Sequence, residues 1–267
     1  MSLGSTVRTK MNYTVDNGVP PDYYFYEPEP GTIKNPPGGD AAGQHKIQLE
    51  ETKMKLYYDP CTVNCRKVLA GFDLLGMKYD TVKIDYFTAG QKSPEYLAIN
   101  PNASLPALDD DGFVLWESNA MLQYAADKLG AEAYYPKDLK TRADINRWML
   151  WESNAWFPST YVYLVENVVK PLLKAEPDQK ILDAQAENFH KLAGILDKRL
   201  ANQPWLAGNS VTIADIAVAA PMHLHTFQKL PLDQHPNLKR WMTERVEKLP
   251  SWKKTDAAPY LGLAAMY

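Results

Sequence analysis

The chain has 267 residues, of which 45% are hydrophobic and 23% charged, so it is long enough for two modest domains with buried cores. Its formal net charge is −3 and its pI is near 6.0, which excludes the basic surface typical of nucleic-acid binding. No stretch approaches the ~20 apolar residues of a membrane span, and the first residues contain no apolar signal core. The two cysteines, Cys61 and Cys65, are four residues apart, unlike a disulfide framework or a zinc pair. These features predict a cytoplasmic protein that binds neither nucleic acid nor membrane.

Residues 1–52 differ from the rest of the chain because they are rich in proline and glycine. Proline at this density removes backbone donors and prevents a regular helix or a central strand. One interpretation of this irregular N-terminal extension is a disordered leader. The other is an ordered arm whose aromatic residues, Tyr23, Tyr24, Phe25 and Tyr26, pack on the body of the protein or on a partner subunit. Aromatic side chains are scarce in disordered segments, which favours the arm.

Residues 53–132 alternate between strand and helix patterns. "MKLYY" predicts a strand, "NCRKVLAGFDLLG" a helix that stops at a glycine, and "KYDTVKID" a second strand parallel to the first. The hairpin "LPALDDDGFVLW" follows, with Asp111 and Gly112 in its turn, and the helix "ESNAMLQYAADKLG" closes the unit. The order βαβ and then ββα predicts a thioredoxin-like α/β domain.

The pattern after this unit is only helical, which predicts an all-α second domain over residues 139–267. Thr212 and Asp215 lie ahead of an apolar run and form a capping box in which Asp replaces the usual Glu. We expect them to order the start of a buried helix and to take no part in chemistry. Four segments have apolar residues at three- and four-residue intervals: 139–170, 178–202, 212–228 and 235–248.

Two short motifs, together with the capping box, resemble the soluble glutathione transferase family. "NPNASLPAL", residues 100–108, is similar to the family's N-P-x-x-x-V-P-x-L segment, in which the proline is cis. "WESNAML", residues 116–122, is similar to its E-S-x-A-I segment. Within the family, "TVNC", residues 62–65, resembles the T-P-N-G that opens the first helix of the Nu class and of its fungal Ure-type relatives.

The resemblance implies a thioredoxin-like α/β domain followed by an all-α domain, and glutathione as a co-substrate held as its thiolate. A free thiol has a pKa near ~8.5, and lowering it by ~2 units requires roughly 2.7 kcal/mol. Hydrogen bonds to a charged group contribute ~1.5–3 kcal/mol each, and a helix N-terminus ~0.3–1 kcal/mol. Thr62 and Asn64, at the start of the first helix, are therefore the candidate catalytic donors, and no general base is needed. The alternative for Thr62 is that it merely caps the helix.

The resemblance also assigns residues to the remainder of the tripeptide. Leu105, before the cis residue Pro106, would pair its backbone with the cysteinyl unit as an added strand. Glu117 would accept a hydrogen bond from the γ-glutamyl ammonium group. Ser118, at the start of a helix, would donate to the neighbouring α-carboxylate.

Three further positions concern the glycyl carboxylate of glutathione. Gln91 and Lys92 lie where the family often places residues for this group. Nu-class proteins usually carry a basic residue at the position of Ser104, so this sequence departs from the pattern there. The loss of that charge leaves more of the task to Lys92.

Cys61 is the competing candidate for the same chemistry. Some transferase classes use a cysteine in this loop to form a mixed disulfide with glutathione, which favours thiol transfer or a glutathione lyase reaction over conjugation. Counting back four residues from Arg66 places Thr62, and not Cys61, at the family's active position. The plain alternative for Cys61 is a small loop residue, and Cys65 is expected to pack. An interpretation from another class is a non-catalytic binding or regulatory module with the same fold.

A co-substrate pocket is expected between the two domains. It would suit a small apolar electrophile or a disulfide, and resemblance to the Nu class implies disulfide-bond reductase activity and a homodimer. His223 and His225 are two apart and point to different faces of a helix, so no metal site is expected. Four aromatic residues are candidates for lining the pocket, with core packing as their alternative: Trp148, Trp151, Trp156 and Tyr161.

Overall fold

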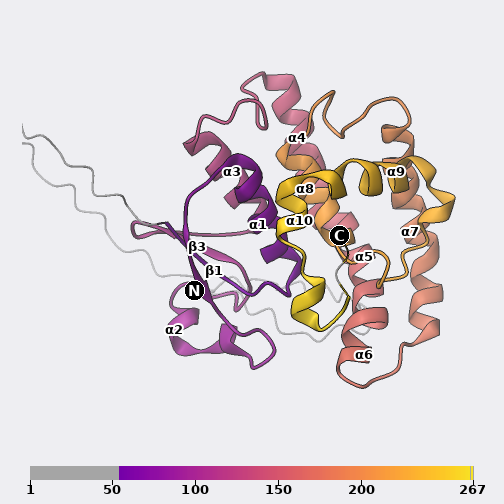
Figure 1. Ribbon diagram of the computed structural model, residues 1–267, viewed down its shortest axis with the longest axis horizontal. Coiled ribbons are helices and arrows are strands. Elements are labelled where there is room, and N and C mark those ends of the chain that lie inside the picture. The colour runs from indigo at the N-terminus through magenta and orange to yellow at the C-terminus, as the bar shows by residue number, and fades with distance from the viewer. Residues whose placement is uncertain (1–53, 265, 267) are drawn as a thin grey trace, which may run out of the picture. The chain divides into compact units, whose positions relative to one another are not determined.

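The computed structural model describes residues 54–264 and 266. These residues belong to one compact unit, Leu49–Tyr267, which contains both the α/β and the helical half (Figure 1). The predicted N-terminal extension, with its cluster of aromatic residues, lies outside the described residues. Within the described part of the chain, no helix is both long enough and apolar enough to cross a membrane.

A four-stranded sheet consists of β1 (Met54–Tyr58), β2 (Asp80–Lys83), β3 (Ala107–Asp110) and β4 (Phe113–Trp116). The strand order is β2-β1-β3-β4, in which β1 and β2 are parallel and β3 is antiparallel to both β1 and β4. Asp111 and Gly112, between β3 and β4, have φ values of 55° and 84°, the left-handed pair that a tight hairpin turn requires. The predicted order of strands and the predicted turn are confirmed.

Three helices accompany the sheet: α1 (Val63–Leu75), the single turn α2 (Pro94–Leu97) and α3 (Ser118–Lys128). α1 and α3 lie side by side (Figure 1). Gly71 permits their close approach, because a Cβ atom at this position would lie 2.2 Å from Leu122 Cδ2. α1 ends at Gly76, whose φ of 75° is the left-handed conformation of a helix end, as the sequence predicted.

A continuous helical stretch opens the second half of the unit. It covers the predicted segment 139–170, but two π-helical turns, Glu152–Trp156 and Val165–Val169, interrupt it. Each π turn comes just before a proline, Pro158 or Pro171. Because a proline ring clashes with the carbonyl group four residues earlier, a wider turn relieves the clash. The α-helical parts are α4 (Leu139–Trp151), α5 (Phe157–Leu164) and α6 (Lys170–Leu172).

The other helices of this half are α7 (Gln179–Leu200), α8 (Ile213–Ala219), α9 (Pro236–Glu244) and α10 (Pro250–Lys254). The predicted helix 212–228 was too long, because α8 passes into a 3-10 turn that ends at Met222. Beyond it, the Gln228 side chain donates to the Pro221 carbonyl oxygen at 2.9 Å and accepts from Leu224 N at 3.3 Å. These bonds satisfy backbone groups that a longer helix would have paired. α10 was not predicted from the sequence.

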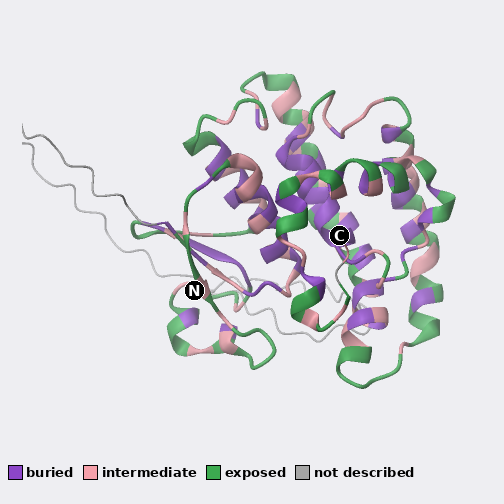
Figure 2. Cartoon of the chain, viewed as in Figure 1, coloured by how far each residue is buried: buried purple, intermediate pink, exposed green. Residues whose placement is uncertain are grey.

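The predicted capping box at the start of α8 is confirmed. One carboxylate oxygen of Asp215 accepts from Thr212 N at 2.9 Å and from Thr212 Oγ1 at 3.0 Å, and the other accepts from Leu206 N at 2.9 Å. Every residue of α8 is buried (Figure 2), and this burial raises the pKa of the Asp215 carboxyl group to about 6. The role of Asp215 is to hold a core helix in place.

Two buried cations on α1 join the two halves, and their burial was not predicted from the sequence. Lys67 Nζ lies 2.8 Å from Glu152 Oε2, with both side chains out of contact with solvent, and donates to Asn119 Oδ1 at 3.2 Å. Arg66 Nη2 donates to the carbonyl oxygen of Trp252 at 2.8 Å, and its guanidinium group lies over the Trp252 ring. These bonds fix α1 to α3, to the helical stretch that begins with α4, and to α10.

Removing one partner of the Lys67–Glu152 pair should destabilise the fold. In Lys67→Met the Glu152 carboxylate stays buried without its counter-charge, so we expect the free energy of unfolding to fall by about 3–5 kcal/mol. The double variant Lys67→Met/Glu152→Met replaces both charges by apolar side chains and should recover most of the loss. Urea unfolding followed by circular dichroism measures both variants. Equal losses in the single and the double variant would contradict this role of the pair.

Candidate active site

The join between β1 and α1 carries the first candidate residue. Thr62 precedes α1 with an extended backbone (φ −94°, ψ 141°), and its carbonyl oxygen accepts from Arg66 N at 3.0 Å. Its side chain does not cap the helix, because Oγ1 donates instead to the Asp59 carbonyl oxygen at 3.2 Å. Thr62 is thus the N-cap residue of α1 by position, without a capping hydrogen bond from its side chain, and its catalytic role stays a prediction. Its hydroxyl group lies half-buried beside the first turn of α1.

Asn64 and Ser118, predicted from separate motifs, meet in the structure. Ser118 Oγ donates to Asn64 Oδ1 at 3.3 Å, although the two residues are 54 positions apart. Asn64 lies in the first turn of α1, and Ser118 is the first residue of α3. The amino ends of two neighbouring helices thus converge, and both carry positive partial charge and N–H groups suited to an anion.

Glu117 lies just before α3 in an uncommon backbone conformation. Its φ is 75° and its ψ is 106°, and its side chain is exposed. Its carbonyl oxygen accepts from Met121 N at 3.0 Å. For a residue other than glycine such a conformation costs about 1–3 kcal/mol and is typical of functional sites.

The predicted cis peptide bond between Leu105 and Pro106 is confirmed. It lies directly before β3, and Leu105 is buried against Cys65 and Tyr96. The exposed Ser104 precedes it, and its carbonyl oxygen accepts from the Tyr96 hydroxyl at 2.7 Å. Leu105 thus belongs to the same buried cluster as Cys65 of α1, while Ser104 beside it is at the surface.

Gln91 and Lys92 lie in a 3-10 turn, Gly90–Lys92, after β2. Gln91 is buried, and its Oε1 finds no hydrogen-bond partner within the described part of the chain. Lys92 is exposed. Gly90 N donates to the Asp85 carbonyl oxygen at 2.8 Å, which ties this turn to the loop that follows β2.

The two cysteines differ in their surroundings. Cys65 is fully buried, and its sulfur accepts from Asp59 N at 3.4 Å, so it packs as expected. Cys61 is half-buried, with its sulfur 3.7 Å from the Tyr260 carbonyl oxygen. Burial, together with the negative charge of Asp59, raises the pKa of the Cys61 thiol to about 12. A thiol with this pKa is almost entirely protonated near neutral pH and is a poor nucleophile.

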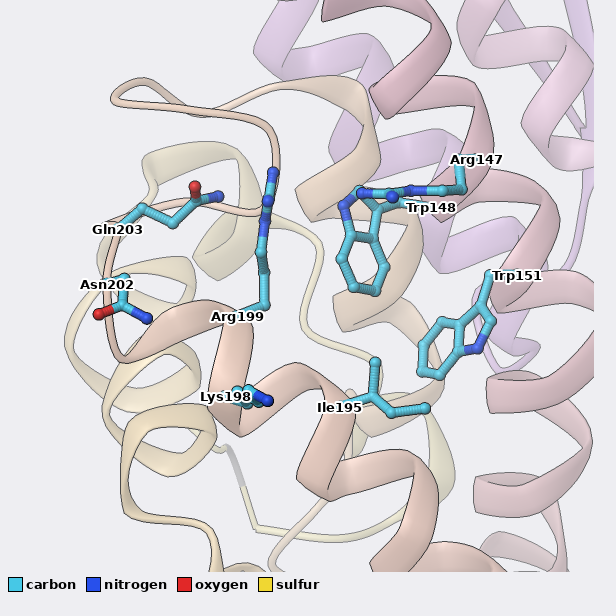
Figure 3. Close-up of a pocket in the computed structure, with 8 residues that line it drawn as sticks. All are labelled: Arg147, Trp148, Trp151, Ile195, Lys198, Arg199, Asn202 and Gln203. Carbon is cyan, nitrogen blue, oxygen red and sulfur yellow. The ribbon is translucent and has the colours of Figure 1, made fainter.

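The four aromatic candidates for a co-substrate pocket are not all together. Trp148 and Trp151 line a cavity between α4 and α7 that includes no residue of the α/β half (Figure 3). Trp156 is fully buried, and its Nε1 donates to the Val218 carbonyl oxygen at 3.1 Å, which makes it a core residue with no surface for a ligand. Tyr161 is 39% exposed.

The two histidines considered for metal binding have separate environments. His223 is buried, and burial lowers its pKa to about 3. His225 Nε2 lies 2.7 Å from Glu247 Oε1. Among residues 54–264 and 266, no group of three or more His, Cys, Asp or Glu side chains is arranged to hold a metal ion.

Comparison with known sequences assigns this arrangement to a family. The family profile "Glutathione S-transferase, N-terminal domain" matches residues 52–127, and "Glutathione S-transferase, C-terminal domain" matches residues 161–250. The protein "Probable glutathione S-transferase GSTF2" of Oryza sativa subsp. japonica is 32% identical over 203 residues, which cover 75% of this chain and 94% of the rice protein. The chain belongs to the glutathione S-transferase family. The predicted fold class and the predicted enzyme class are confirmed.

Solved structures of other glutathione S-transferases are similar to this one. Glutathione S-transferase-I bound with lactoylglutathione has a TM-score of 0.70 at 30% identity, over 77% of this chain and 99% of that chain. A theta class glutathione S-transferase from Xanthomonas axonopodis pv. citri, with glutathione bound, has a TM-score of 0.69 at 28% identity, over 77% and 97%. These relatives support the family but not the Nu class, which stays a prediction.

One residue that organises the loop beside the candidate site was not predicted from the sequence. Asp59 is buried; its Oδ1 accepts from Cys61 N at 2.8 Å, and its Oδ2 accepts from Tyr86 N at 2.9 Å. It thereby ties the loop before α1 to the loop after β2. The sequence contained a signal for this role, because an Asp followed by a proline is typical of a turn. In such an Asx turn the Asp side chain accepts a hydrogen bond from the backbone N–H two residues later.

Cys61 of this glutathione S-transferase should react slowly. Because its pKa is about 12, we expect little alkylation by iodoacetamide at neutral pH and a rate that rises about tenfold per pH unit while the protein stays folded. Asp59→Asn removes the negative charge, lowers the pKa and should accelerate the reaction at a fixed pH. Peptide mass spectrometry distinguishes Cys61 from Cys65. Rapid alkylation of Cys61 at neutral pH would contradict the assignment of a protonated thiol.

Proposed function

We propose that this glutathione S-transferase activates the thiol of glutathione for attack on an electrophilic carbon or on a disulfide. The observation that carries the proposal is the bond from Ser118 Oγ to Asn64 Oδ1, which holds the amino ends of α1 and α3 together. Two helix amino ends favour the binding of a carboxylate and a thiolate at the same place. The two similar structures described above contain glutathione or lactoylglutathione, which supports glutathione as the co-substrate.

The proposed thiolate site is the half-buried surface around Thr62. Its hydroxyl group donates to the Asp59 carbonyl oxygen at 3.2 Å, and its proton can turn instead to a sulfur anion, since bonds to charged acceptors are the stronger ones. The Asn64 oxygen already accepts from Ser118, so its amide N–H groups remain as donors. Two such bonds and the helix amino end exceed the roughly 2.7 kcal/mol that lowers a thiol pKa by ~2 units. The thiol proton leaves to water.

The proposed reaction follows from a free thiolate. In conjugation, the sulfur forms a bond to the electrophilic carbon, and the leaving group departs with the bonding electron pair. With a disulfide substrate, the sulfur forms a mixed disulfide and releases a thiolate, which is then protonated by water. A second glutathione thiolate resolves the mixed disulfide, so two glutathione molecules are oxidised as the substrate is reduced. The resemblance to the Nu class favours this second route.

The remainder of glutathione is proposed to lie along the surface that ends at Thr62. Leu105, before the cis bond, would pair its backbone with the cysteinyl unit, as an added strand beside β3. Glu117, held at positive φ, would accept from the γ-glutamyl ammonium group. The amide of Gln91 and the ammonium group of Lys92 would donate to the glycyl carboxylate.

The electrophile is proposed to lie over Tyr161 and not between the tryptophans. Tyr161 is 39% exposed, and its pKa is raised mainly by burial and also by Tyr86. From the C-terminal segment, the Tyr260 carbonyl oxygen lies 3.7 Å from the Cys61 sulfur. The exposed part of the Tyr161 ring offers an aromatic surface, which favours an apolar substrate.

A homodimer and a cytoplasmic location complete the proposal. β4 is an edge strand, and its Phe113 and Trp116 side chains are 51% and 42% exposed. Proteins normally cover an apolar sheet edge, and a second copy of this chain is the proposed cover. Both cysteines are free thiols, which fits a reducing compartment.

Thr62→Ala removes the proposed hydroxyl donor to the thiolate. We expect kcat/KM for conjugation of glutathione with chlorodinitrobenzene to fall by about 10- to 100-fold, the loss of one hydrogen bond to a charged group. The pH profile should also move upward, because the thiolate forms at higher pH without that donor. Thr62→Ser keeps the hydroxyl group and should retain most of the activity.

Two controls separate this proposal from its alternatives. Cys61→Ser should stay close to the parent, and loss of activity in this variant alone would show that the threonine assignment is wrong. Calorimetric titration should show glutathione binding to the parent at millimolar ligand or below. Failure to bind would favour a non-catalytic module with the same fold.

Trp116→Glu places a charge on the proposed dimer face of β4. We expect the dissociation constant of the dimer to rise at least about tenfold, since a buried, unpaired charge is strongly disfavoured at an interface. Sedimentation equilibrium measures this change. Leu173→Glu, at another exposed apolar residue in the helical half, is the matched control and should leave the dimer intact. A parent protein that stays monomeric would sink the dimer proposal.

A further inference from the structure

The segment between α2 and β3 is built around one buried side chain, Asn100. Asn100 has no exposed surface. Its Oδ1 accepts from Asn102 N at 3.1 Å and from Asn102 Nδ2 at 3.0 Å, and its Nδ2 donates to the Ser104 carbonyl oxygen at 2.8 Å. Ala103 N donates to the Asn100 carbonyl oxygen at 3.1 Å, which closes a turn between the two residues. The position of the Ser104 carbonyl group therefore depends on a buried amide.

A second buried donor meets the same carbonyl oxygen. Tyr96, in α2, is 1% exposed, and its hydroxyl group donates to the Ser104 carbonyl oxygen at 2.7 Å. Burial raises the pKa of the Tyr96 phenol, so the hydroxyl group keeps its proton and remains a donor near neutral pH. A carbonyl oxygen has two lone pairs, and the two donors use both. The Tyr96 hydroxyl and the Asn100 amide thus form a clamp on Ser104.

The clamp decides the direction of the Leu105 N–H group. This N–H and the Ser104 carbonyl belong to one peptide unit, which is trans. In a trans peptide unit the oxygen and the hydrogen point in opposite directions. Because the Ser104 oxygen is held toward the two buried donors, the Leu105 N–H points away from them. It donates to no acceptor within the described part of the chain, and a free backbone N–H of this kind is what an added strand needs.

The Tyr96 ring also joins this peptide unit to the start of α1. Tyr96, Leu105 and Cys65 belong to one small buried cluster, separate from the main core. Cys65 follows Asn64, which is one of the two proposed donors to the thiolate. The cluster therefore fixes the spacing between the Leu105 backbone and the first turn of α1. A single extended ligand would have to meet both points at once, so this spacing matters for its binding.

We propose that Tyr96 and Asn100 are positioning residues for glutathione, which hold the Ser104 carbonyl inward so that the Leu105 N–H is already aimed at the cysteinyl carbonyl oxygen. The inference rests on the proposed function, in which Leu105 pairs with the cysteinyl unit. A peptide unit that is oriented in advance costs less free energy to order when the ligand binds. The clamp acts on the peptide backbone and not on the thiol, so it sets the affinity for glutathione and leaves the chemical step unchanged.

Tyr96→Phe tests the clamp, because it removes only the hydroxyl group and keeps the ring in its cluster. We expect the dissociation constant for glutathione, measured by calorimetric titration of the full chain, to rise about fivefold through the loss of one hydrogen bond. KM for glutathione should rise by a similar factor. kcat, the pH profile of kcat and KM for chlorodinitrobenzene should stay at their parental values, which is the pattern of lost ground-state binding.

Tyr135→Phe is the matched control. Tyr135 is 5% exposed, and its hydroxyl group donates to Asn146 Oδ1 at 2.8 Å, so the variant loses a buried hydrogen bond of the same kind outside this cluster. It should lose a comparable amount of stability in urea unfolding and bind glutathione as the parent does. Asn100→Asp replaces the second donor by an oxygen of similar size and should weaken glutathione binding about tenfold or more.

Three results would overturn the clamp while the parent binds glutathione normally. The first is unchanged glutathione affinity in Tyr96→Phe, which does not depend on how well Asn100→Asp folds. The second is equal weakening in Tyr96→Phe and Tyr135→Phe, which would make a general loss of stability the cause. The third is a fall in kcat of Tyr96→Phe at unchanged KM, which would place Tyr96 in the chemical step. A parent that fails to bind glutathione would instead refute the proposed function, and this inference with it.

Discussion

The buried pairing of Lys67 with Glu152 is the constraint on which the arrangement of the two halves depends. A charge removed from water must meet its counter-charge, so α1 has one position relative to the stretch that begins with α4. Asn119 joins the same network, donating to Glu152 Oε2 at 3.0 Å and to the Met149 carbonyl oxygen at 2.8 Å, and so places α3 as well. When α1 and α3 are fixed in this way, their amino ends lie close enough for Ser118 to contact Asn64.

The proposed glutathione site lies at these helix ends, whose positive potential would favour the thiolate of bound glutathione. Asp59 contributes in two ways. Its carboxylate fixes the loop before α1 against the loop after β2, and its negative charge adds to the burial that keeps the Cys61 thiol protonated. The same residue thus shapes the loop that contains the proposed site at Thr62 and keeps the neighbouring Cys61 thiol protonated.

The helical stretch from α4 to α6 serves both halves because its faces differ. Glu152 points to α1, whereas Trp148 and Trp151 point to α7. Helical spacing puts the two tryptophans on one face, and their rings are in contact. The spacing of residues along a helix does not show which other helix packs against that face. The tryptophans that were expected to line the co-substrate pocket therefore line the cavity between α4 and α7 instead.

The sequence by itself determined the features that depend on neighbours along the chain. Local sterics and hydrogen bonding within a few residues decide the strand alternation, the glycine that ends α1 and the capping box of Thr212 and Asp215. The cis bond before Pro106 was predicted from the resemblance to the family. Only the tertiary structure decided which side chains meet across the fold. The Ser118–Asn64 bond and the burial of Lys67 against Glu152 both depend on how segments far apart in sequence pack. Packing is a collective property of the whole core, and no short motif contains it.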